Sequence, residues 1–338
     1  MRVAAAQLRP VWLDPAQTTR KVLSYVERAA DAGVDVIAFS ETFVSGYPFW
    51  MCRTNGAAFD DPQQKEAYAR YLEAAIETTG PELSEIAQAA QDFDVFVLLG
   101  FTERGVRAAH NSTFCALAAI DPGRGLVGVH RKLAPTHDER LVWARGDGHG
   151  LRAHPFRGTR LSGLCCWENW MPQARHALYA DAAEVHFAVW PGWSRLTPDI
   201  TRFIAMEGRV YSVAASGLLS YDDVPDDFPM LDEMRANFPE LPFDGGSCIA
   251  GPDGQWLASP LCDEEGLVIA DIDPHRVRQE RLMFDPTGHY SRPDVFHTVV
   301  SRERQEAAVF IDSPAQGLQD GSAEGVGDRL GQTTPSLS

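Results

Sequence analysis

The sequence predicts an α/β fold in which two mixed β-sheets are covered by helices. Short apolar segments alternate with segments of helical spacing, and hairpins are added to this alternation. The second half of the chain follows a plan similar to that of the first. The chain has 338 residues, of which 44% are hydrophobic, and it can therefore bury a large core. We expect one large domain rather than two small ones.

The first half of the chain begins with a strand at 1–8 and continues in β-α-β-α-β order. Asp14 and Pro15 are typical of a helix start, and Gly33 is typical of a helix end. The elements expected after this helix are a strand at 34–39, helices at 62–79 and 81–92, a strand at 94–100, and a hairpin with strands at 111–120 and 126–130.

The second half of the chain has a similar order, with a strand at 161–166 and a helix that begins at Pro172. The acidic, proline-containing segment 222–240 is expected to be an insertion on the surface. Residues 313–338 lack aromatic side chains, so we expect a disordered tail there. The remaining expected elements are a strand at 185–190, a helix at 198–209, a strand at 211–218 and a hairpin around 251–254.

Charge and composition exclude several classes of protein. A net charge of −17 without a cluster of Lys and Arg argues against a nucleic-acid partner. No run of about eighteen apolar residues is present to span a membrane, and the strand-like N-terminus does not resemble a signal peptide. Six cysteines without a short-domain framework indicate reduced thiols rather than disulfides. We therefore expect a cytoplasmic protein with no membrane contact.

Cys166 lies at a predicted strand-to-helix junction, within Gly163-Leu-Cys-Cys-Trp-Glu-Asn-Trp-Met-Pro172. A thiol at such a junction can be exposed at the edge of the sheet, and the amide groups of the turn can favour the reactive thiolate. The segment therefore indicates a thiol nucleophile. A buried structural cysteine is the alternative, because free cysteine is among the most buried residue types.

Candidate catalytic residues follow three strand-like segments, and they are Glu41, Lys132 and Cys166. Sites in α/β sheets gather beyond the carboxyl ends of strands. A carboxylate base, a cation and a thiol are also the groups that covalent acyl-type hydrolysis requires. Taken singly, Glu41 could cap a turn and Lys132 could be a solvated surface charge. Spacing alone does not show that the three residues meet.

Three segments resemble the signature segments of the nitrilase branch of the carbon-nitrogen hydrolase superfamily, and they occur in the family's order. These segments are Phe39–Pro48, His130–Arg140 and Gly163–Asn169. Two further segments, Gly245–Gly254 and Gly288–Asp294, resemble later nitrilase segments. The resemblance implies that Glu41 is the base, Lys132 the family's lysine and Cys166 the nucleophile. It also implies that Glu139 is a second glutamate, which supports the lysine and the substrate.

The same resemblance implies a four-layer α-β-β-α sandwich at 1–300, followed by a C-terminal extension at 301–312. Family members associate into homo-oligomers, which are dimers or larger spirals. Two positions depart from the family pattern. Cys165 stands where many members have asparagine, and Ser40 stands where many have proline. Neither departure removes a catalytic group.

The implied reaction is hydrolysis of a small-molecule nitrile. The Cys166 thiolate attacks the nitrile carbon, and Lys132 or Glu41 protonates the nitrogen of the thioimidate. Water activated by Glu41 then releases ammonia, and a thioester is hydrolysed to the carboxylic acid. The Trp167 backbone N–H and Lys132 are expected to stabilise the tetrahedral intermediates. No cofactor or metal is expected, since metal-binding spacing is absent around His130, His137, His149 and His154.

Aromatic residues near strand ends are candidates for substrate binding, and Trp167, Trp190 and Trp193 are the ones we select. Trp190 and Trp193 flank a Pro-Gly turn after a predicted strand, and Phe49 and Trp50 offer similar side chains. Ordinary packing in the core or at an interface is the alternative for each of them.

Three other functions remain open. An amidase or carbamoylase of the same superfamily uses the same glutamate, lysine and cysteine, although Trp167-Glu168 after the cysteine resembles the nitrilase branch. A cyanide-hydrating enzyme is a second alternative. A non-catalytic nitrilase-like binding protein belongs to another class, and reaction with a thiol-reactive probe would distinguish it.

Overall fold

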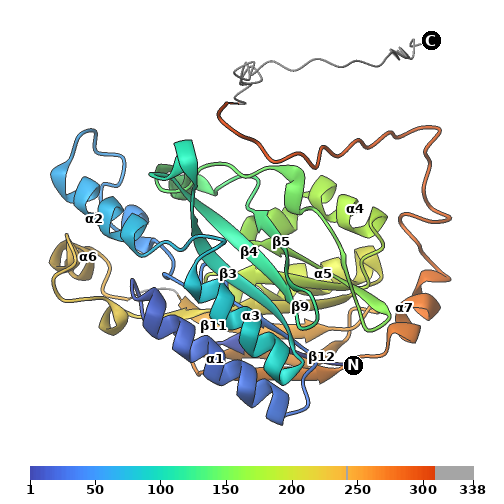
Figure 1. Cartoon of the computed structure of the whole chain (residues 1–338). Coiled ribbons are helices and arrows are strands. Elements are labelled where there is room, and N and C mark those ends of the chain that lie inside the picture. Colours follow the sequence, from blue (N-terminus) through green and yellow to red (C-terminus); the bar gives the residue numbers. More distant parts are fainter. Residues whose placement is uncertain (241–242, 309–338) are drawn as a thin grey trace, which may run out of the picture. The chain divides into compact units, whose positions relative to one another are not determined.

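Two mixed β-sheets, each covered by helices on its outer face, make up the fold (Figure 1). The computed structural model describes residues 1–240 and 243–308. Residues 1–305 form one compact unit. The expected disordered tail lies outside the described residues, and the division of the chain at 300 and 312 stays a prediction. Within the described ranges, no helix combines the length and the hydropathy needed to cross a bilayer.

The first sheet has the strand order β13-β1-β2-β3-β4-β5. Its central strands β1, β2 and β3 are parallel, and β13, β4 and β5 extend it in antiparallel pairing. The strands are β1 (Arg2–Gln7), β2 (Val36–Phe39), β3 (Phe96–Arg104), β4 (Thr113–Asp121), β5 (Gly125–Arg131) and β13 (Gly266–Asp271). The helices α1 (Pro15–Asp31) and α3 (Pro81–Phe93) lie side by side over this sheet (Figure 1).

The second sheet has the order β10-β11-β9-β8-β7-β6, with β12 paired to β11. Its central strands β7, β8 and β9 are parallel. The strands are β6 (His154–Phe156), β7 (Thr159–Cys165), β8 (Val185–Trp190), β9 (Tyr211–Ser216), β10 (Leu218–Leu219), β11 (Phe243–Ala250) and β12 (Trp256–Cys262). The helices α4 (Pro172–Ala180) and α5 (Pro198–Gly208) contact each other, and α5 packs on β9 and β11.

Alternate residues of β1 face opposite layers, because successive side chains of a strand point to opposite faces of the sheet. Val3 and Ala5 lie in the apolar cluster between the two sheets, which also contains Phe187 of β8. Ala4 and Ala6 lie in a second cluster, together with apolar residues of α1 and α3. Two smaller clusters join the second sheet to α4 and α5. The layers therefore follow the expected α-β-β-α order, and the predicted fold class is confirmed.

The helix predicted at 62–79 is shorter in the structure. It is α2 (Pro62–Glu73), and the chain after it runs along β3. Ile76 N–H donates to the Thr102 carbonyl, and Arg104 N–H donates to the Ile76 carbonyl. These strand-like hydrogen bonds use the backbone groups that a longer helix would have needed.

Segment 222–240, which was expected to be an insertion on the surface, has many exposed residues but is also anchored in the core. The segment contains α6 (Leu231–Asn237), and Phe228, Leu231 and Met234 are buried in the cluster between the sheets. The Phe228 ring packs edge-on against Trp12, with ring centroids 4.8 Å apart. The apolar residues recur every three positions, so this periodicity decides the local structure despite the acidic composition. The last helix, α7 (Pro274–Arg281), follows β13.

Candidate active site

The three predicted catalytic residues come together just beyond the ends of three strands. Glu41 follows β2, Lys132 follows β5, and Cys166 follows β7. The Lys132 Nζ donates to Glu41 Oε1 at 2.9 Å, and both side chains are fully buried. A carboxylate oxygen of Glu41, one of Glu139 and the Cys166 sulfur all lie within 4.8 Å of one another. The surface-charge alternative for Lys132 is therefore wrong, and this cluster is the candidate active site.

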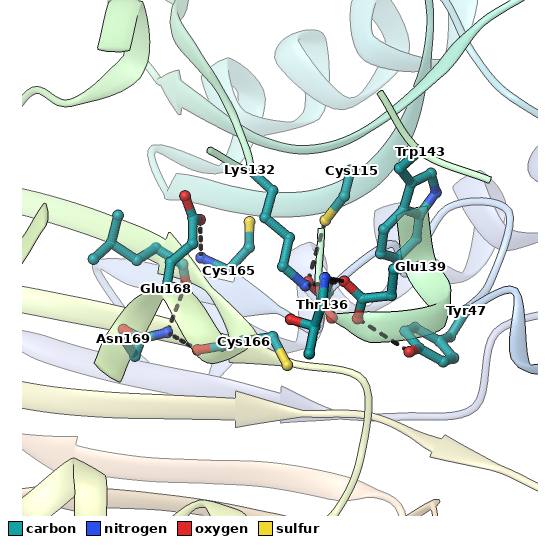
Figure 2. A network of polar contacts seen from close by, with 12 residues as sticks. Tyr47, Cys115, Lys132, Thr136, Glu139, Trp143, Cys165, Cys166, Glu168 and Asn169 are labelled. Carbon is teal, nitrogen blue, oxygen red and sulfur yellow. Dashed lines mark hydrogen bonds and ion pairs between the residues drawn. The ribbon is translucent and has the colours of Figure 1, made fainter. Parts of the chain in front are cut away.

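Glu139 also takes part in this cluster, on the short 3₁₀ helix His137–Leu141. Its Oε2 accepts from Lys132 Nζ at 2.7 Å and from the Thr136 N–H at 2.6 Å. Its Oε1 accepts from the Tyr47 hydroxyl at 3.0 Å. Figure 2 shows Lys132, Glu139 and Tyr47 converging from separate segments of the chain. The hydrogen bonds fix the ammonium group between two carboxylates.

The path of the backbone places Glu41 at the base of the site. The Glu41 N–H donates to the Trp190 carbonyl at 3.3 Å, which joins the ends of β2 and β8. Gly100 of β3 lies close to Ser40, the residue before Glu41. A Cβ at Gly100 would lie only 2.0 Å from the Ser40 carbonyl oxygen. A larger residue than glycine would therefore displace the segment that carries Glu41.

Burial controls the protonation states of the charged groups. It raises the pKa of Glu41 to about 7, although the Lys132 ammonium acts in the opposite direction. Burial also opposes the charge on Lys132, but Glu139 and Glu41 outweigh it and hold the pKa of Lys132 well above its ordinary value. Lys132 therefore stays protonated near neutral pH, whereas Glu41 can take up and release a proton there.

Cys166 differs from the sequence expectation in its exposure and protonation. Its side chain is buried, not exposed at the edge of the sheet. Burial raises the pKa of the Cys166 thiol well above its ordinary value, and Glu41 adds to this, while the Trp167 N–H favours the thiolate only weakly. The turn amide therefore favours the thiolate as expected, but burial and Glu41 outweigh it, so the resting group is the neutral thiol. Cys166 also has a φ of 50°, a left-handed conformation that is strained for a residue with a side chain.

A cavity of about 200 Å³ leads to the Cys166 thiol. Trp167, Trp190 and Trp193 all line it, whereas Phe49 and Trp50 are not among its lining residues. Phe49 and Trp50 pack in the core between the sheets, so for them the core alternative holds. The other lining residues are Tyr47, Cys52, Arg53, Thr136, His137, Asp138, Glu139, Pro191, Leu196 and Phe243.

A larger hollow of about 650 Å³ lies elsewhere, beside the start of α1, and contains none of these catalytic groups. The smaller cavity is the relevant one, because Cys166 and Glu139 are among the residues that line it. Its volume is below the range of about 300–1,000 Å³ that is usual for sites of drug-sized ligands. A small substrate fits this space.

The sequence profile of the family described as carbon-nitrogen hydrolase matches residues 2–281. The chain belongs to this family. An aliphatic nitrilase from Rhodococcus rhodochrous is 35% identical over 87% of this chain and 81% of its own length. A nitrilase from Pseudomonas syringae pv. syringae (strain B728a) is also 35% identical, over 87% of this chain and 88% of the relative. The family resemblance seen in the motifs is confirmed.

Solved structures agree with this carbon-nitrogen hydrolase in fold. An amidase from Nesterenkonia sp. AN1 superposes with a TM-score of 0.60 at 20% sequence identity, and the match covers 83% of this chain and 96% of the amidase. At this identity the likeness concerns the fold alone.

In this carbon-nitrogen hydrolase, Glu168 holds the turn that carries Cys166. The buried Glu168 carboxylate pairs with His130 Nε2 at 3.0 Å and accepts from the N–H groups of Leu133 and Cys165 at 2.6 and 3.1 Å. Burial opposes its ionisation, but His130 and these amides hold the pKa of Glu168 below its ordinary value. The carboxylate therefore connects the segment after β5 to the end of β7.

Replacement of Glu168 by glutamine is expected to lower the free energy of unfolding by about 1.5–3 kcal/mol, the usual contribution of hydrogen bonds to a charged group. Because the folded-state pKa is depressed, this stabilisation is present above the unfolded pKa and is lost as pH falls through the folded pKa. Urea unfolding at several pH values measures both effects. An unchanged stability and pH slope in the variant would contradict this role.

The ligand atoms of Glu41, Glu139 and Cys166 lie close enough together to hold a metal ion. However, the Lys132 ammonium group already supplies the positive charge between the two carboxylates. Its ammonium group donates to both carboxylates. Two of the four histidines considered earlier have other contacts, since His130 pairs with Glu168 and His149 bonds the Arg302 carbonyl. The residues present suit an internal cation better than a bound metal.

The sequence did not indicate the residues that support the catalytic groups. Tyr47 lies within a recognised motif, but nothing in the motif shows that its hydroxyl bonds Glu139. Cys115 of β4 was not singled out in the sequence, yet its Sγ lies 3.2 Å from Glu41 Oε1. Both contacts depend on packing between strands that are far apart in sequence, so no local pattern carries them.

Proposed function

We propose that this carbon-nitrogen hydrolase is a nitrilase, which converts a small organic nitrile into the carboxylic acid and ammonia. The observation that carries the proposal is a buried thiol that lines an aromatic cavity. Beside it lie a carboxyl group with a pKa of about 7 and a lysine that donates to two carboxylates. The identity of 34–35% to several curated nitrilases supports the same function. Trp167, Trp190 and Trp193 are the proposed substrate-binding residues.

The first chemical step begins with a neutral thiol. Glu41 Oε1 is occupied by its hydrogen bonds, whereas the buried Oε2 has no partner among the described residues and can accept the Cys166 proton. The sulfur then forms a bond to the nitrile carbon as one carbon-nitrogen π bond breaks. The nitrogen takes up a proton from Glu41 or Lys132, and the product is a covalent thioimidate.

The remaining steps consume two water molecules. Glu41 removes a proton from the first water molecule while the oxygen of that water adds to the thioimidate carbon. The nitrogen is then protonated and leaves as ammonia. The resulting thioester reacts with a second water in the same way, which releases the carboxylic acid and restores the Cys166 thiol. Lys132 and the Trp167 N–H stabilise the negative charge that develops in the tetrahedral intermediates.

A screen of aliphatic, aromatic and arylacetonitriles with detection of ammonia tests the proposal. The aromatic walls of the cavity make arylaliphatic and aromatic nitriles the first choice. We expect acid and ammonia in near-equal amounts, with amide as a minor product. A thiol alkylator should stop the reaction, and a chelator should not. Hydrolysis of the matching amides without consumption of any nitrile would instead identify an amidase.

Alkylation of Cys166 by iodoacetamide is expected to become faster as pH rises through about 7, the pKa of Glu41. The base form of a carboxyl group accumulates above its pKa, and this form must take the thiol proton. Glu41→Gln should therefore lack this rise. Mass spectrometry of the peptide that contains Cys166 gives the rate. A rise that occurs only near the much higher pKa of the thiol itself would show that Glu41 is not the base.

We infer in addition that the protein forms homo-oligomers. Exposed apolar side chains lie on the turn before α4, at Trp170, and on α5, at Phe203 and Met206. Such side chains are typical of contact surfaces between subunits. Light scattering coupled to size-exclusion chromatography tests the inference. A monomer at micromolar concentration would contradict it.

We place the protein in the cytoplasm. Its proposed nucleophile must stay reduced, and all six cysteines lie within the described ranges without a disulfide. A reducing compartment suits this set of thiols. Cell fractionation with an antibody to the protein would test the location.

A further inference from the structure

Cys115 contacts both the proposed base and the segment that carries the lysine. Its Sγ lies 3.2 Å from Glu41 Oε1, with both groups buried. Its backbone carbonyl accepts the Lys132 N–H at 2.8 Å. Cys115 lies in β4, which pairs with β5 directly before Lys132, so the position of its side chain is set by the sheet. One residue of β4 therefore contacts two groups of the site.

The two oxygens of Glu41 have different surroundings. Oε1 accepts from Lys132 Nζ and from the Cys115 thiol, whereas Oε2 is buried and has no partner within the described residues. A carboxyl group turns readily about its last side-chain bond, because that torsion is broad and nearly two-fold. Two donors on one oxygen hold this torsion more firmly than one donor does. The free oxygen is then kept available for the proton of Cys166.

The Cys115 thiol stays protonated and can therefore donate a hydrogen bond to Glu41. Burial raises the pKa of Cys115 well above its ordinary value, so the sulfur keeps its proton at neutral pH. A donor to a carboxylate favours the ionised form, and the contact with Cys115 acts to lower the pKa of Glu41. Without this donor, Glu41 would bind its proton more tightly, and fewer molecules would carry the active base at neutral pH.

We propose that Cys115 is a positioning residue, whose S–H group orients the Glu41 carboxylate and favours its ionised form. The proposal rests on the proposed function only in treating Glu41 as the base that takes the Cys166 proton. Cys115 is not among the lining residues of the substrate cavity, so its proposed action passes through Glu41. Serine at this position would keep a donor of similar size, whereas alanine would remove the donor.

The test compares Cys115→Ala and Cys115→Ser by the pH dependence of Cys166 alkylation with iodoacetamide, followed by mass spectrometry. This measurement needs no nitrile, so it stays valid if the proposed substrate class is wrong. We expect the rise of the alkylation rate to move to higher pH by about 0.5 unit or more in Cys115→Ala, since a modest hydrogen bond is removed. Cys115→Ser should restore the wild-type position. With an active nitrile, Cys115→Ala should lower kcat severalfold and leave KM unchanged.

Two controls separate this role from packing. Cys248→Ala removes a buried thiol of β11 that contacts the Thr201 hydroxyl, and Cys262→Ala removes an exposed thiol of β12. Both should keep the wild-type pH dependence of alkylation. A wild-type pH dependence in Cys115→Ala would overturn the proposal. An equal shift in Cys115→Ser and Cys115→Ala would also overturn it, because packing alone would then explain the effect. Failure to find any nitrile substrate would count against the proposed function and not against this role.

Discussion

Replacement of Cys166 by alanine is expected to abolish nitrile hydrolysis, whereas replacement of Cys165 is expected to leave much of it. The two residues are adjacent, but they face different surroundings. Cys166 lines the cavity beside Glu41 and Glu139. Cys165 is the last residue of β7 and lies in the apolar cluster between the sheets. Only the first thiol can form a bond to a substrate in the cavity.

Release of ammonia from an active nitrile measures the effect of both substitutions, and covalent labelling by iodoacetamide identifies the reactive thiol. The Cys165→Ala variant is the matched control, because it loses the same sulfur from the neighbouring position. Activity in Cys166→Ala together with loss in Cys165→Ala would reverse the assignment of the nucleophile. Circular dichroism should show that both variants remain folded.

Replacement of Lys132 by alanine is expected to lower the rate at least about 10²-fold, because a buried cation that stabilises developing charge is lost. Its removal also leaves Glu41 and Glu139 buried without their shared partner. Two carboxyl groups at this distance do not both ionise easily, so at least one of them should bind a proton near neutral pH. A base that is already protonated cannot accept the proton of Cys166.

Glu41→Gln and Glu139→Gln are expected to lose at least about 10²-fold as well, since each keeps the shape of the side chain and removes its charge. Steady-state kinetics gives the rates, and circular dichroism checks the fold. A variant that stays folded with kinetics near those of the wild type would exclude its residue from the mechanism. The glutamine variants remove charge without removing volume. They therefore separate the effect of charge from that of the cavity that Lys132→Ala would leave.

Local sequence patterns predicted the central strands well, because their cause is local. The apolar runs that end at Phe39 and at Cys165 are bounded by turns, and the structure has β2 and β7 there. The pairing of β13 with β1 was not predicted, since the two strands lie at opposite ends of the domain. The core contacts of 222–240 were also missed, because the segment is acidic as a whole and the contact of Phe228 with Trp12 joins residues far apart in sequence.

The members of the site were predicted better than its electrostatics. The strand ends and the family resemblance indicated Glu41, Lys132, Glu139 and Cys166, and the structure brings all four together. The protonation states depend on burial, which no sequence pattern reports. At Cys166 the effect of burial outweighs that of the turn amide, so the resting group is a neutral thiol.

The pairing of β1 with β13 has a consequence for the synthesis of the protein. Arg2 pairs with Asp271, and the Met1 amino group donates to the Ile272 carbonyl. β1 is the first strand to be synthesised, and it cannot pair with β13 until that last strand has been made. Until then one edge of the first sheet has free N–H and C=O groups that can pair with other chains. Contacts between such distant residues also slow folding. A chain interrupted before Gly266 would keep this edge open, and we expect it to aggregate even though every proposed catalytic residue is already present.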